Sequence, residues 1–186
     1  MTSAFVVVYD ACVLCPNTLR DLLIRIAQRG LVQAKWSDTI LDEVFRNLAA
    51  DLPDVDPQKW DVLRDRMNKA VRDSRVSTFE RLIDGLELPD PDDLHVLAVA
   101  IKSGAQVIVT HNLKDFPADE LAEWDVEAKS PDDFIADQIY LDKKIVYGEI
   151  TRIADSRKNP AQTVEDVLDQ MENSGLVVSA ALLRSP

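Results

Sequence analysis

Two short, continuous apolar runs constrain the fold of this chain most strongly. Residues 5–9 read FVVVY and residues 106–110 read QVIVT, in which only the first and last residues are polar. A strand with apolar side chains on both sides must be covered on both faces, which is typical of the centre of a parallel sheet. We therefore expect both runs to be buried strands of one sheet.

Helical patterns alternate with these strands along the chain. Two weaker runs, at 31–36 and 124–130, predict a short second strand and an edge strand. Apolar residues at helical spacing, with capping residues before them or glycine after them, predict helices at 18–30, 37–50, 58–75, 77–87 and 94–103. Strands that alternate with helices of this length predict an α/β fold, with a parallel sheet, right-handed crossovers and helices on both faces.

Only helices are expected near the end of the chain. A capped helix begins at Ser130, and further helices are expected near 137–157, at 163–175 with Thr163 as cap, and at 176–184. A chain of 186 residues can bury one full core. We therefore predict a main domain at 1–135 and a helical extension at 136–186 that packs on it.

Charge and apolar content limit the possible functions. No apolar run approaches the about 20 residues that span a bilayer, and residues 1–10 lack the basic region of a signal peptide. We therefore expect a cytoplasmic protein without membrane contact. The net charge of −12 argues against binding nucleic acid. However, residues 82–142 hold 15 acidic and 3 basic side chains, whereas residues 59–81 are net +3, so a basic rim beside an acidic centre remains open.

The chain holds two cysteines, Cys12 and Cys15, in the sequence DACVLCP. A CxxC motif between a strand and a helix is typical of thiol–disulfide oxidoreductases, which need a lowered thiolate pKa. Asp10 beside the motif would repel a thiolate and so oppose this function. The alternatives are two small residues that pack at the turn, or a metal site completed by His95 and His111.

Several carboxylates follow the predicted strands. Asp10 ends the first buried strand, and Asp115 lies in the loop after the second, at the sheet edge where α/β proteins bind ligands. Asp93 begins the helix before the second strand. We expect that helix to start at the amino ends of the strands, unless a long connection carries Asp93 to the crevice. Glu43 lies one turn into its helix, facing along a groove. DACVL lacks the second acid that an aspartyl nucleophile needs.

Four segments resemble, in order and spacing, the four motifs of the PIN domain. They read VVVYDACVL, SDTILDEVFRNL, DPDDLHVLAVAIKSGAQVIVT and THNLKDF. PIN domains are metal-dependent ribonucleases, of which the VapC toxins of bacterial toxin–antitoxin pairs are the most numerous. The resemblance covers about residues 3–135. It implies a three-layer α/β/α fold with acids gathered at one edge of the sheet, so that 1–135 would be a nuclease domain.

The resemblance also assigns roles to single residues. By position, the catalytic and metal-binding acids would be Asp10, Glu43, Asp93 and Asp115, with Thr110 and Asn112 in supporting positions. Asp93 is placed by lying eleven residues before the Gly104 that ends its helix. Asp90 and Asp92 match no catalytic position, and we assign them to the helix cap, the helix dipole and the loop.

The implied activity is hydrolysis of RNA phosphodiester bonds by water that Mg²⁺ or Mn²⁺ activates. The implied partners are RNA and an antitoxin protein, with a homodimer as a further option. Candidates for basic residues around the site are Arg20, Arg46, Lys102 and Lys114, each weighed against an ordinary surface charge. His95 could touch the site, although a core histidine with its hydrogen bonds satisfied is the favoured interpretation. A non-catalytic RNA-binding PIN protein remains an alternative, although such proteins usually lack some of these acids.

Overall fold

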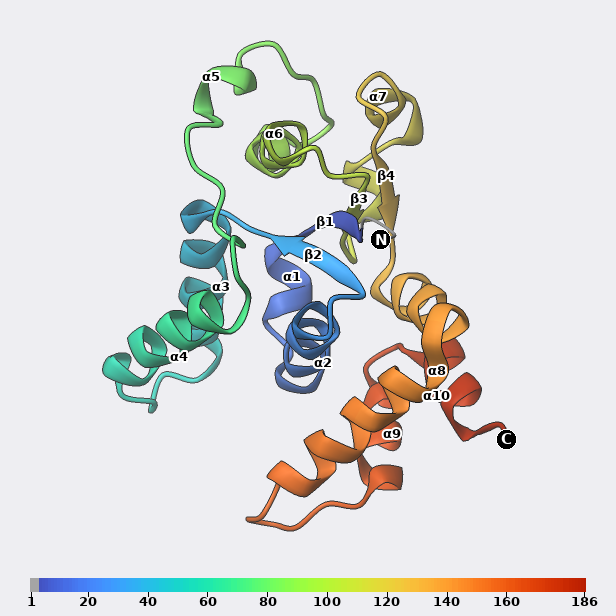
Figure 1. The fold of residues 1–186 in the computed structure, drawn as a ribbon. Coiled ribbons are helices and arrows are strands. Elements are labelled where there is room, and N and C mark those ends of the chain that lie inside the picture. Colours follow the sequence, from blue (N-terminus) through green and yellow to red (C-terminus); the bar gives the residue numbers. More distant parts are fainter. Residues whose placement is uncertain (1–3) are drawn as a thin grey trace.

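A four-stranded parallel sheet forms the centre of the computed structural model, which describes residues 4–186 (Figure 1). Its strands are ordered β2 (Val32–Lys35), β1 (Phe5–Tyr9), β3 (Val107–Val109), β4 (Glu127–Lys129). All three neighbouring pairs run parallel. The two apolar runs therefore take the central positions, as predicted, and the edge position of β4 is confirmed.

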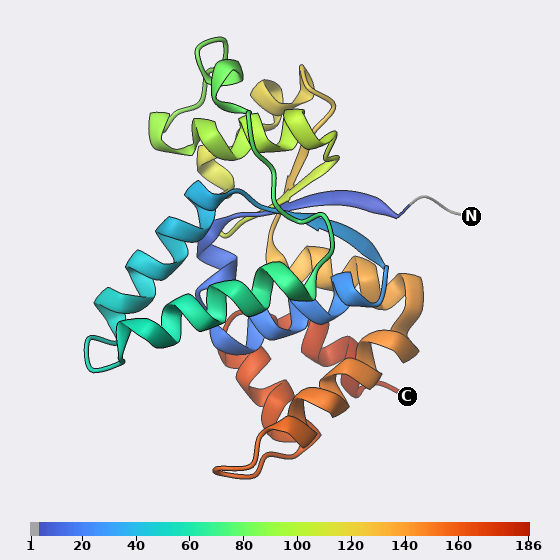
Figure 2. The ribbon, with the colours of Figure 1, turned by 60° about the vertical axis from the view of Figure 1, so that its left-hand side comes forward.

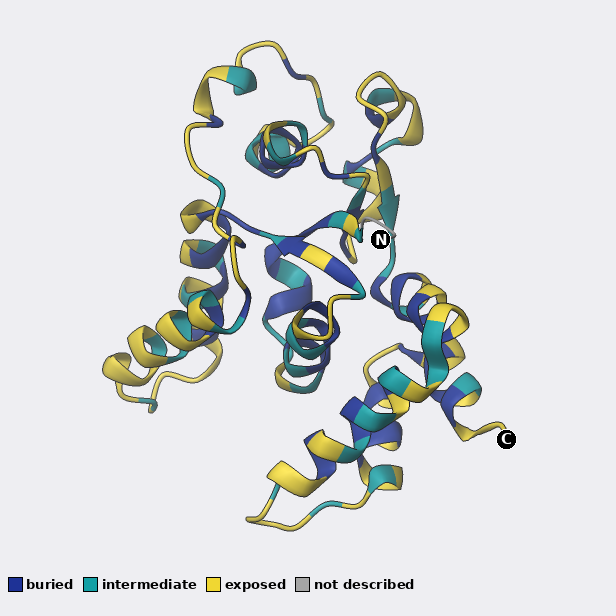
Figure 3. Ribbon diagram, in the orientation of Figure 1, coloured by how far each residue is buried: buried dark blue, intermediate teal, exposed yellow. Residues whose placement is uncertain are grey.

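Helices cover both faces of the sheet, which confirms the three-layer α/β/α fold. On one face α6 (Leu94–Ser103) contacts β1 and β3. On the other face lie α1 (Ala11–Leu14) and α2 (Asn17–Gln28), and α2 contacts β2 (Figure 1). Buried residues concentrate where these layers meet, whereas the outward sides of the helices are exposed (Figure 3).

The helix expected at 58–75 is shorter than predicted. It follows α3 (Asp38–Asp51), which Ser37 caps through the backbone N–H of Ile40 at 3.1 Å, and the two helices form a hairpin that projects from the sheet (Figure 2). The second helix, α4 (Pro57–Ala70), ends before residue 71. The segment 74–76 instead pairs with Trp36 through an isolated parallel β-bridge, with two backbone hydrogen bonds of 2.8 Å. Those hydrogen bonds replace the expected last turn of helix.

Several single turns of helix were not predicted. The helix expected at 77–87 is reduced to α5 (Glu80–Ile83). The unpredicted turns are α1, the 3₁₀ turns η1 (Pro91–Asp93) and η2 (Leu113–Asp115), and α7 (Ala118–Ala122). Each is too short to show the apolar periodicity on which helix prediction depends.

The prediction that the chain has no signal peptide concerns residues 1–10, of which residues 1–3 lie outside the described residues.

The C-terminal helices pack on the main domain beside α2 (Figure 1). They are α8 (Pro131–Ser156), α9 (Val164–Asn173) and α10 (Val177–Arg184). The two helices expected at the start of this region are joined in α8, which is interrupted at Asp142. Thr163 caps α9 as predicted. The boundary at 135/136 stays a prediction. Within residues 4–186, no helix is both long and apolar enough to cross a membrane.

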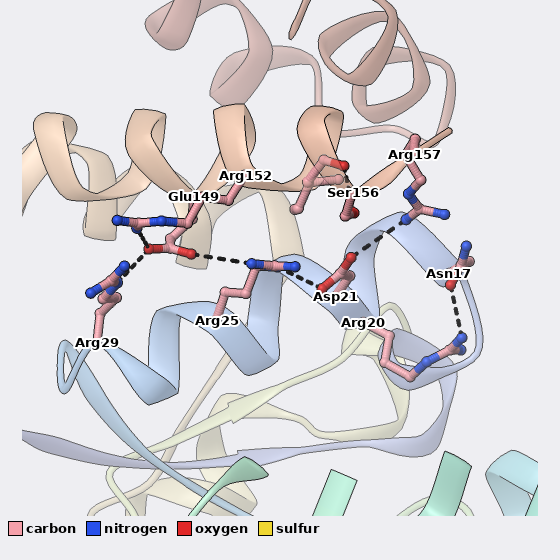
Figure 4. A network of polar contacts seen from close by, with 10 residues as sticks. Asn17, Arg20, Asp21, Arg25, Arg29, Glu149, Arg152, Ser156 and Arg157 are labelled. Carbon is pink, nitrogen blue, oxygen red and sulfur yellow. Dashed lines mark hydrogen bonds and ion pairs between the residues drawn. The ribbon is translucent and has the colours of Figure 1, made fainter. Parts of the chain in front are cut away.

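A buried carboxylate joins the C-terminal helices to the main domain (Figure 4). Glu149 of α8 is 2% exposed and pairs with Arg25 of α2, with Arg29 just after α2 and with Arg152 of α8. The Arg25 Nη1 atom lies 3.6 Å from Oε2 of Glu149. Burial opposes ionisation of Glu149, but the hydrogen bond from Arg29 and the charges of Arg29 and Arg152 outweigh it and lower its pKa. Glu149 therefore stays charged in the folded protein.

Replacing Glu149 with glutamine should lower the free energy of unfolding by about 2 kcal/mol. Removing one partner of a fully buried ion pair costs about 3–5 kcal/mol. The cost is smaller here because the side chains of Arg29 and Arg152 are 42% and 54% exposed and stay hydrated. Chemical denaturation followed by circular dichroism at pH 7 measures the difference.

Glu165→Gln provides the matched control, because Glu165 pairs with Arg184 at the surface and is 62% exposed. This change should cost less than about 1 kcal/mol.

Because folding lowers the pKa of Glu149, its contribution to stability is present above the unfolded value of about 4.3 and is lost as pH falls through the folded pKa. Equal losses in the two variants would show that Glu149 contributes no more than a surface pair.

Candidate functional site

Asp10 lies at the carboxyl end of β1, where the backbone turns into α1. It is 5% exposed, and its Oδ1 accepts the N–H of Ala11 at 2.7 Å, which caps the short helix. Its Oδ2 accepts the hydroxyl of Thr110 at 2.8 Å and the thiol of Cys12 at 3.4 Å. The structure thus buries this carboxylate but gives both of its oxygens hydrogen-bond donors, which offset the cost of burial.

Thr110 and Asn112 support Asp10 from the neighbouring strand. Thr110 follows β3 directly and is fully buried. Its hydroxyl oxygen accepts the backbone N–H of Asn112 at 3.0 Å. The pairing of β1 with β3 continues past the strands through a hydrogen bond of 3.1 Å from the N–H of Asp10 to the carbonyl of Val109. The sheet therefore places these two predicted supporting residues beside Asp10.

An acidic cavity of about 560 Å³ lies close enough to Asp10 for the charge of Asp10 to act on its acids, but Asp10 and Asp115 are not among the residues that line it. It is lined by Thr39, Asp42, Glu43, Arg46, Asp90, Asp92, Asp93, His95 and Asn112. Burial, Asp10 and Asp92 raise the pKa of Glu43, while Arg46 opposes the shift. His95 contacts this cavity, with Nε2 3.9 Å from Oε2 of Glu43, and its buried Nδ1 has no partner among the described residues. The favoured prediction of a satisfied core histidine is therefore wrong.

Asp93 is the most perturbed acid of the site. Burial raises its pKa to about 7, and the charges of Asp10, Asp90, Asp115 and Glu43 act in the same direction. Its buried Oδ2 accepts no hydrogen bond from the described residues. Three of the acids that the resemblance selected, Asp10, Glu43 and Asp115, are therefore close enough to the fourth, Asp93, to oppose its ionisation.

The contacts of Asp90, Asp92 and Asp93 agree in part with the roles predicted for them. Asp90 caps η1, because its carboxylate accepts the N–H of Asp92 at 2.9 Å, whereas Asp93 makes no side-chain cap for α6. Asp92 was assigned to the helix and loop, but its side chain also lines the cavity. Its charge opposes ionisation of Glu43 and partly offsets the burial that lowers the pKa of His95.

The edge of the sheet at which the helix after Asp93 was predicted to start was wrong. We expected it to start at the amino ends of the strands. The helix before a strand of a parallel sheet runs antiparallel to that strand. It therefore starts at the carboxyl edge of the sheet and ends near the amino end of the strand that follows it. Asp93 therefore reaches the edge where Asp10 ends β1, and no special connection is required.

The donor set fits a hard divalent cation in its chemistry. Mg²⁺ and Mn²⁺ prefer oxygen ligands, and carboxylates dominate this cavity. The unpaired Oδ2 of Asp93 and the raised pKa of that carboxyl are what a site arranged for positive charge would show. Across residues 4–186, however, no three histidine, cysteine or acidic side chains are already arranged to hold an ion. Binding would therefore require some of these side chains to turn toward the ion.

Two of the four proposed rim cations lie elsewhere. Arg20 is 7% exposed, and its guanidinium donates to the carbonyls of Leu14 and Cys15 at 2.9 and 2.8 Å, so it supports the turn before α2. Lys102 lies in the last turn of α6, at the opposite end of that helix from Asp93. Arg46 does line the cavity, and Lys114 is exposed in η2 next to Asp115.

The cysteines are not poised for redox chemistry. Burial and the charge of Asp10 raise the pKa of Cys12 to about 12, and burial raises that of Cys15. Both thiols therefore stay protonated at neutral pH, which opposes nucleophilic attack on a disulfide. The interpretation of Cys12 as a residue that only packs at the turn is incomplete, because its sulfur contacts the polar side chains of Asp10 and Thr110. The only sequence signal for this contact was the position of Cys12 two residues after Asp10.

Comparisons with known proteins agree with this geometry. A PIN-domain family model matches residues 6–114, and a second model, the VapC50 C-terminal domain, matches residues 131–185. The chain is 40% identical over 79 residues to the Mycobacterium tuberculosis H37Rv protein named "Putative ribonuclease VapC50". That stretch covers 42% of this chain and 47% of the relative, about half of its length. No solved structure matches the chain significantly.

Asp93→Asn should stabilise the metal-free protein more at pH 8 than at pH 5. The folded pKa of Asp93 is raised, so the favourable protonated form is present at low pH and is lost as pH rises through about 7. Asparagine removes the charge that is repelled at pH 8 and replaces a neutral carboxyl at pH 5. Thermal unfolding in EDTA at the two pH values measures the difference.

Asp90→Asn is the control for the same segment. Asparagine can still accept the N–H of Asp92, so the cap of η1 is largely kept, and any stabilisation at pH 8 should be smaller than that of Asp93→Asn, because Asp90 is only one of the charges that oppose ionisation of Asp93. A stabilisation by Asp93→Asn that is equal at both pH values would contradict a neutral-range pKa for this carboxyl.

Proposed function

This chain belongs to the PIN-domain family, and from that premise we propose that it is a metal-dependent endoribonuclease. The observation that carries the proposal is that Asp10, Glu43 and Asp115 oppose the ionisation of Asp93, whose buried Oδ2 has no hydrogen-bond donor among the described residues. Such crowding of acids opposes folding in the absence of a cation, so a site of this kind is best explained by a function that requires one. The donor chemistry favours Mg²⁺ or Mn²⁺.

Asp10, Asp93 and Asp115 would hold the ion, with Glu43 acting through a water or orienting the attacking water. The ion, when bound, supplies a Lewis acid that lowers the pKa of water and offsets charge on the phosphate. The chain itself supplies orientation. Thr110 fixes Asp10 through the hydrogen bond of 2.8 Å, and the fold of β1 against β3 holds that pair in place.

Substrate binding would use the few cations at this edge. Arg46 lines the cavity, and Lys114 lies in η2 beside Asp115, so both can reach a phosphate that approaches the acids. Their charges would offset the repulsion between an acidic cavity and an anionic RNA strand, together with the ion. A non-catalytic RNA-binding function is less favoured, because all four acids of the set are present in this chain.

We further propose that the protein acts in the cytoplasm as the toxin of a toxin–antitoxin pair. This rests on the family membership and on the similarity to the mycobacterial relative, whose name describes a ribonuclease. The match of residues 131–185 to the VapC50 C-terminal domain extends the similarity beyond the nuclease domain. A small DNA-binding protein encoded directly upstream would support this role, and co-purification of the two chains would test it.

Asp10→Asn should abolish cleavage of a structured RNA in Mn²⁺ or Mg²⁺. Asparagine keeps an oxygen that can accept the N–H of Ala11 but removes the charge that would bind the ion. The loss should be at least about a hundredfold, the scale on which metal-site polar groups contribute to rate. Gel-based cleavage assays measure it, and circular dichroism in EDTA checks that the variant is folded. A fully active Asp10→Asn enzyme would remove Asp10 from the site.

Mn²⁺ should stabilise the native protein against unfolding. An ion that binds only the folded state adds about 2.7 kcal/mol when its free concentration is a hundredfold above its dissociation constant. Asp93→Asn should reduce this gain strongly, and Asp90→Asn should keep it. Thermal shift titrations with Mn²⁺ compare the parent protein with Asp90→Asn, Asp92→Asn and Asp93→Asn. Retention of the gain in Asp93→Asn but not in Asp92→Asn would move the ligand position by one residue.

A further inference from the structure

Cys12 contacts the site, although the proposed function has given it no role. It is half-buried in α1, and its sulfur lies 3.4 Å from Oδ2 of Asp10 and 3.5 Å from Oγ1 of Thr110. The backbone N–H of His111 donates to the same sulfur at 3.3 Å. The second cysteine of the motif differs, because the Cys15 sulfur lies 3.9 Å from the carbonyl of Val44.

The protons in this cluster can be assigned from the available donors. Thr110 has one hydroxyl proton, and its short distance of 2.8 Å to Asp10 places that proton on the line to Oδ2. Thr110 Oγ1 already accepts the N–H of Asn112 at 3.0 Å. The thiol of Cys12 also has one proton, and an ionised carboxylate is a stronger acceptor than a hydroxyl. Cys12 therefore donates to Asp10 and accepts from His111.

Two donor chains thus converge on one carboxylate oxygen. One chain runs from the N–H of Asn112 through Thr110, and the other runs from the N–H of His111 through Cys12. Both begin in the loop after β3 and end on Asp10 at the end of β1. Because Oδ1 is held by the N–H of Ala11, neither oxygen of Asp10 can turn without breaking a hydrogen bond.

We propose that Cys12 is a positioning residue of the nuclease site, which orients Asp10 and ties the loop at 111–115 to it. The proposal deepens the proposed function and rests on it. Cys12 does not touch the substrate, since its effect passes through Asp10 and through the loop that carries Asp115. Groups that hydrogen-bond to metal ligands typically contribute about 10–100-fold to metal affinity or activity.

Three variants separate this role from simple packing. Cys12→Ala removes the donor, Cys12→Ser restores a hydroxyl donor at the same position, and Cys15→Ala removes the other thiol of the motif. We expect Cys12→Ala to weaken Mn²⁺ binding by about tenfold or more, Cys12→Ser to recover most of the loss, and Cys15→Ala to bind as the parent does. Electron paramagnetic resonance of free Mn²⁺ measures the affinity without RNA. Should Cys12→Ala fail to fold, Cys12→Val keeps the volume without a donor.

A second measurement needs no metal. In the metal-free protein, Cys12→Ala should shift the backbone amide resonance of His111, whose N–H loses its sulfur acceptor, and Cys15→Ala should leave it in place. An unmoved His111 amide would overturn the proposal. So would parental Mn²⁺ affinity in Cys12→Ala, or an equal loss in Cys12→Ala and Cys12→Ser, because a packing role needs no donor.

Asp10→Asn separates the failure of this proposal from the failure of the proposed function. If Asp10→Asn loses Mn²⁺ binding while Cys12→Ala keeps it, Cys12 has no positioning role and the metal site stands. If Asp10→Asn binds Mn²⁺ as the parent does, the proposed metal site is wrong and the role of Cys12 falls with it. Loss in Asp10→Asn and Cys12→Ala, with recovery in Cys12→Ser, supports both.

Discussion

The parallel pairing of β1 with β3 is the interaction on which the site depends. The pair is buried on both faces, and Val8 lies opposite Ile108 with both side chains fully enclosed. The pairing continues beyond the strands, so that Asp10 and Thr110 emerge side by side at the carboxyl edge. The apolar core thus holds two polar side chains in contact, although about 100 residues of chain separate them.

Charge acts in opposite ways in the two halves of the molecule. At the carboxyl edge of the sheet, several acidic side chains lie close together with few cations among them. Burial and the repulsion from neighbouring acids raise the pKa values of Asp93 and Glu43. Between α2 and α8, three arginines surround the buried Glu149, and its pKa is lowered. The second arrangement stabilises the packing of the C-terminal helices on the main domain. The first leaves the site with an electrostatic cost that a bound cation would relieve.

Most of the fold could be predicted, but several side-chain positions could not. Continuous apolar runs and helical periodicity identified the strands and the long helices, and Thr163 was correctly predicted as the cap of α9. The predicted length of α4 was wrong. The pairing of 74–76 with Trp36 is a long-range interaction that leaves no local pattern in the sequence. Arg20 was a candidate for the rim or an ordinary surface charge, yet its buried guanidinium donates to the backbone carbonyls of a nearby turn. Charge alone does not say which way a long side chain points.

The sequence by itself determined the alternation of strands and helices, because apolar spacing is a local property that each segment carries alone. It also determined which carboxylates follow strands, through their position directly after the apolar runs. Only the tertiary structure decided which of these acids interact, and that Cys12 and His95 contact them. The reason is physical: hydrogen bonds and charge repulsion depend on distances of a few ångströms between residues far apart in the chain, and those distances exist only after the sheet has formed.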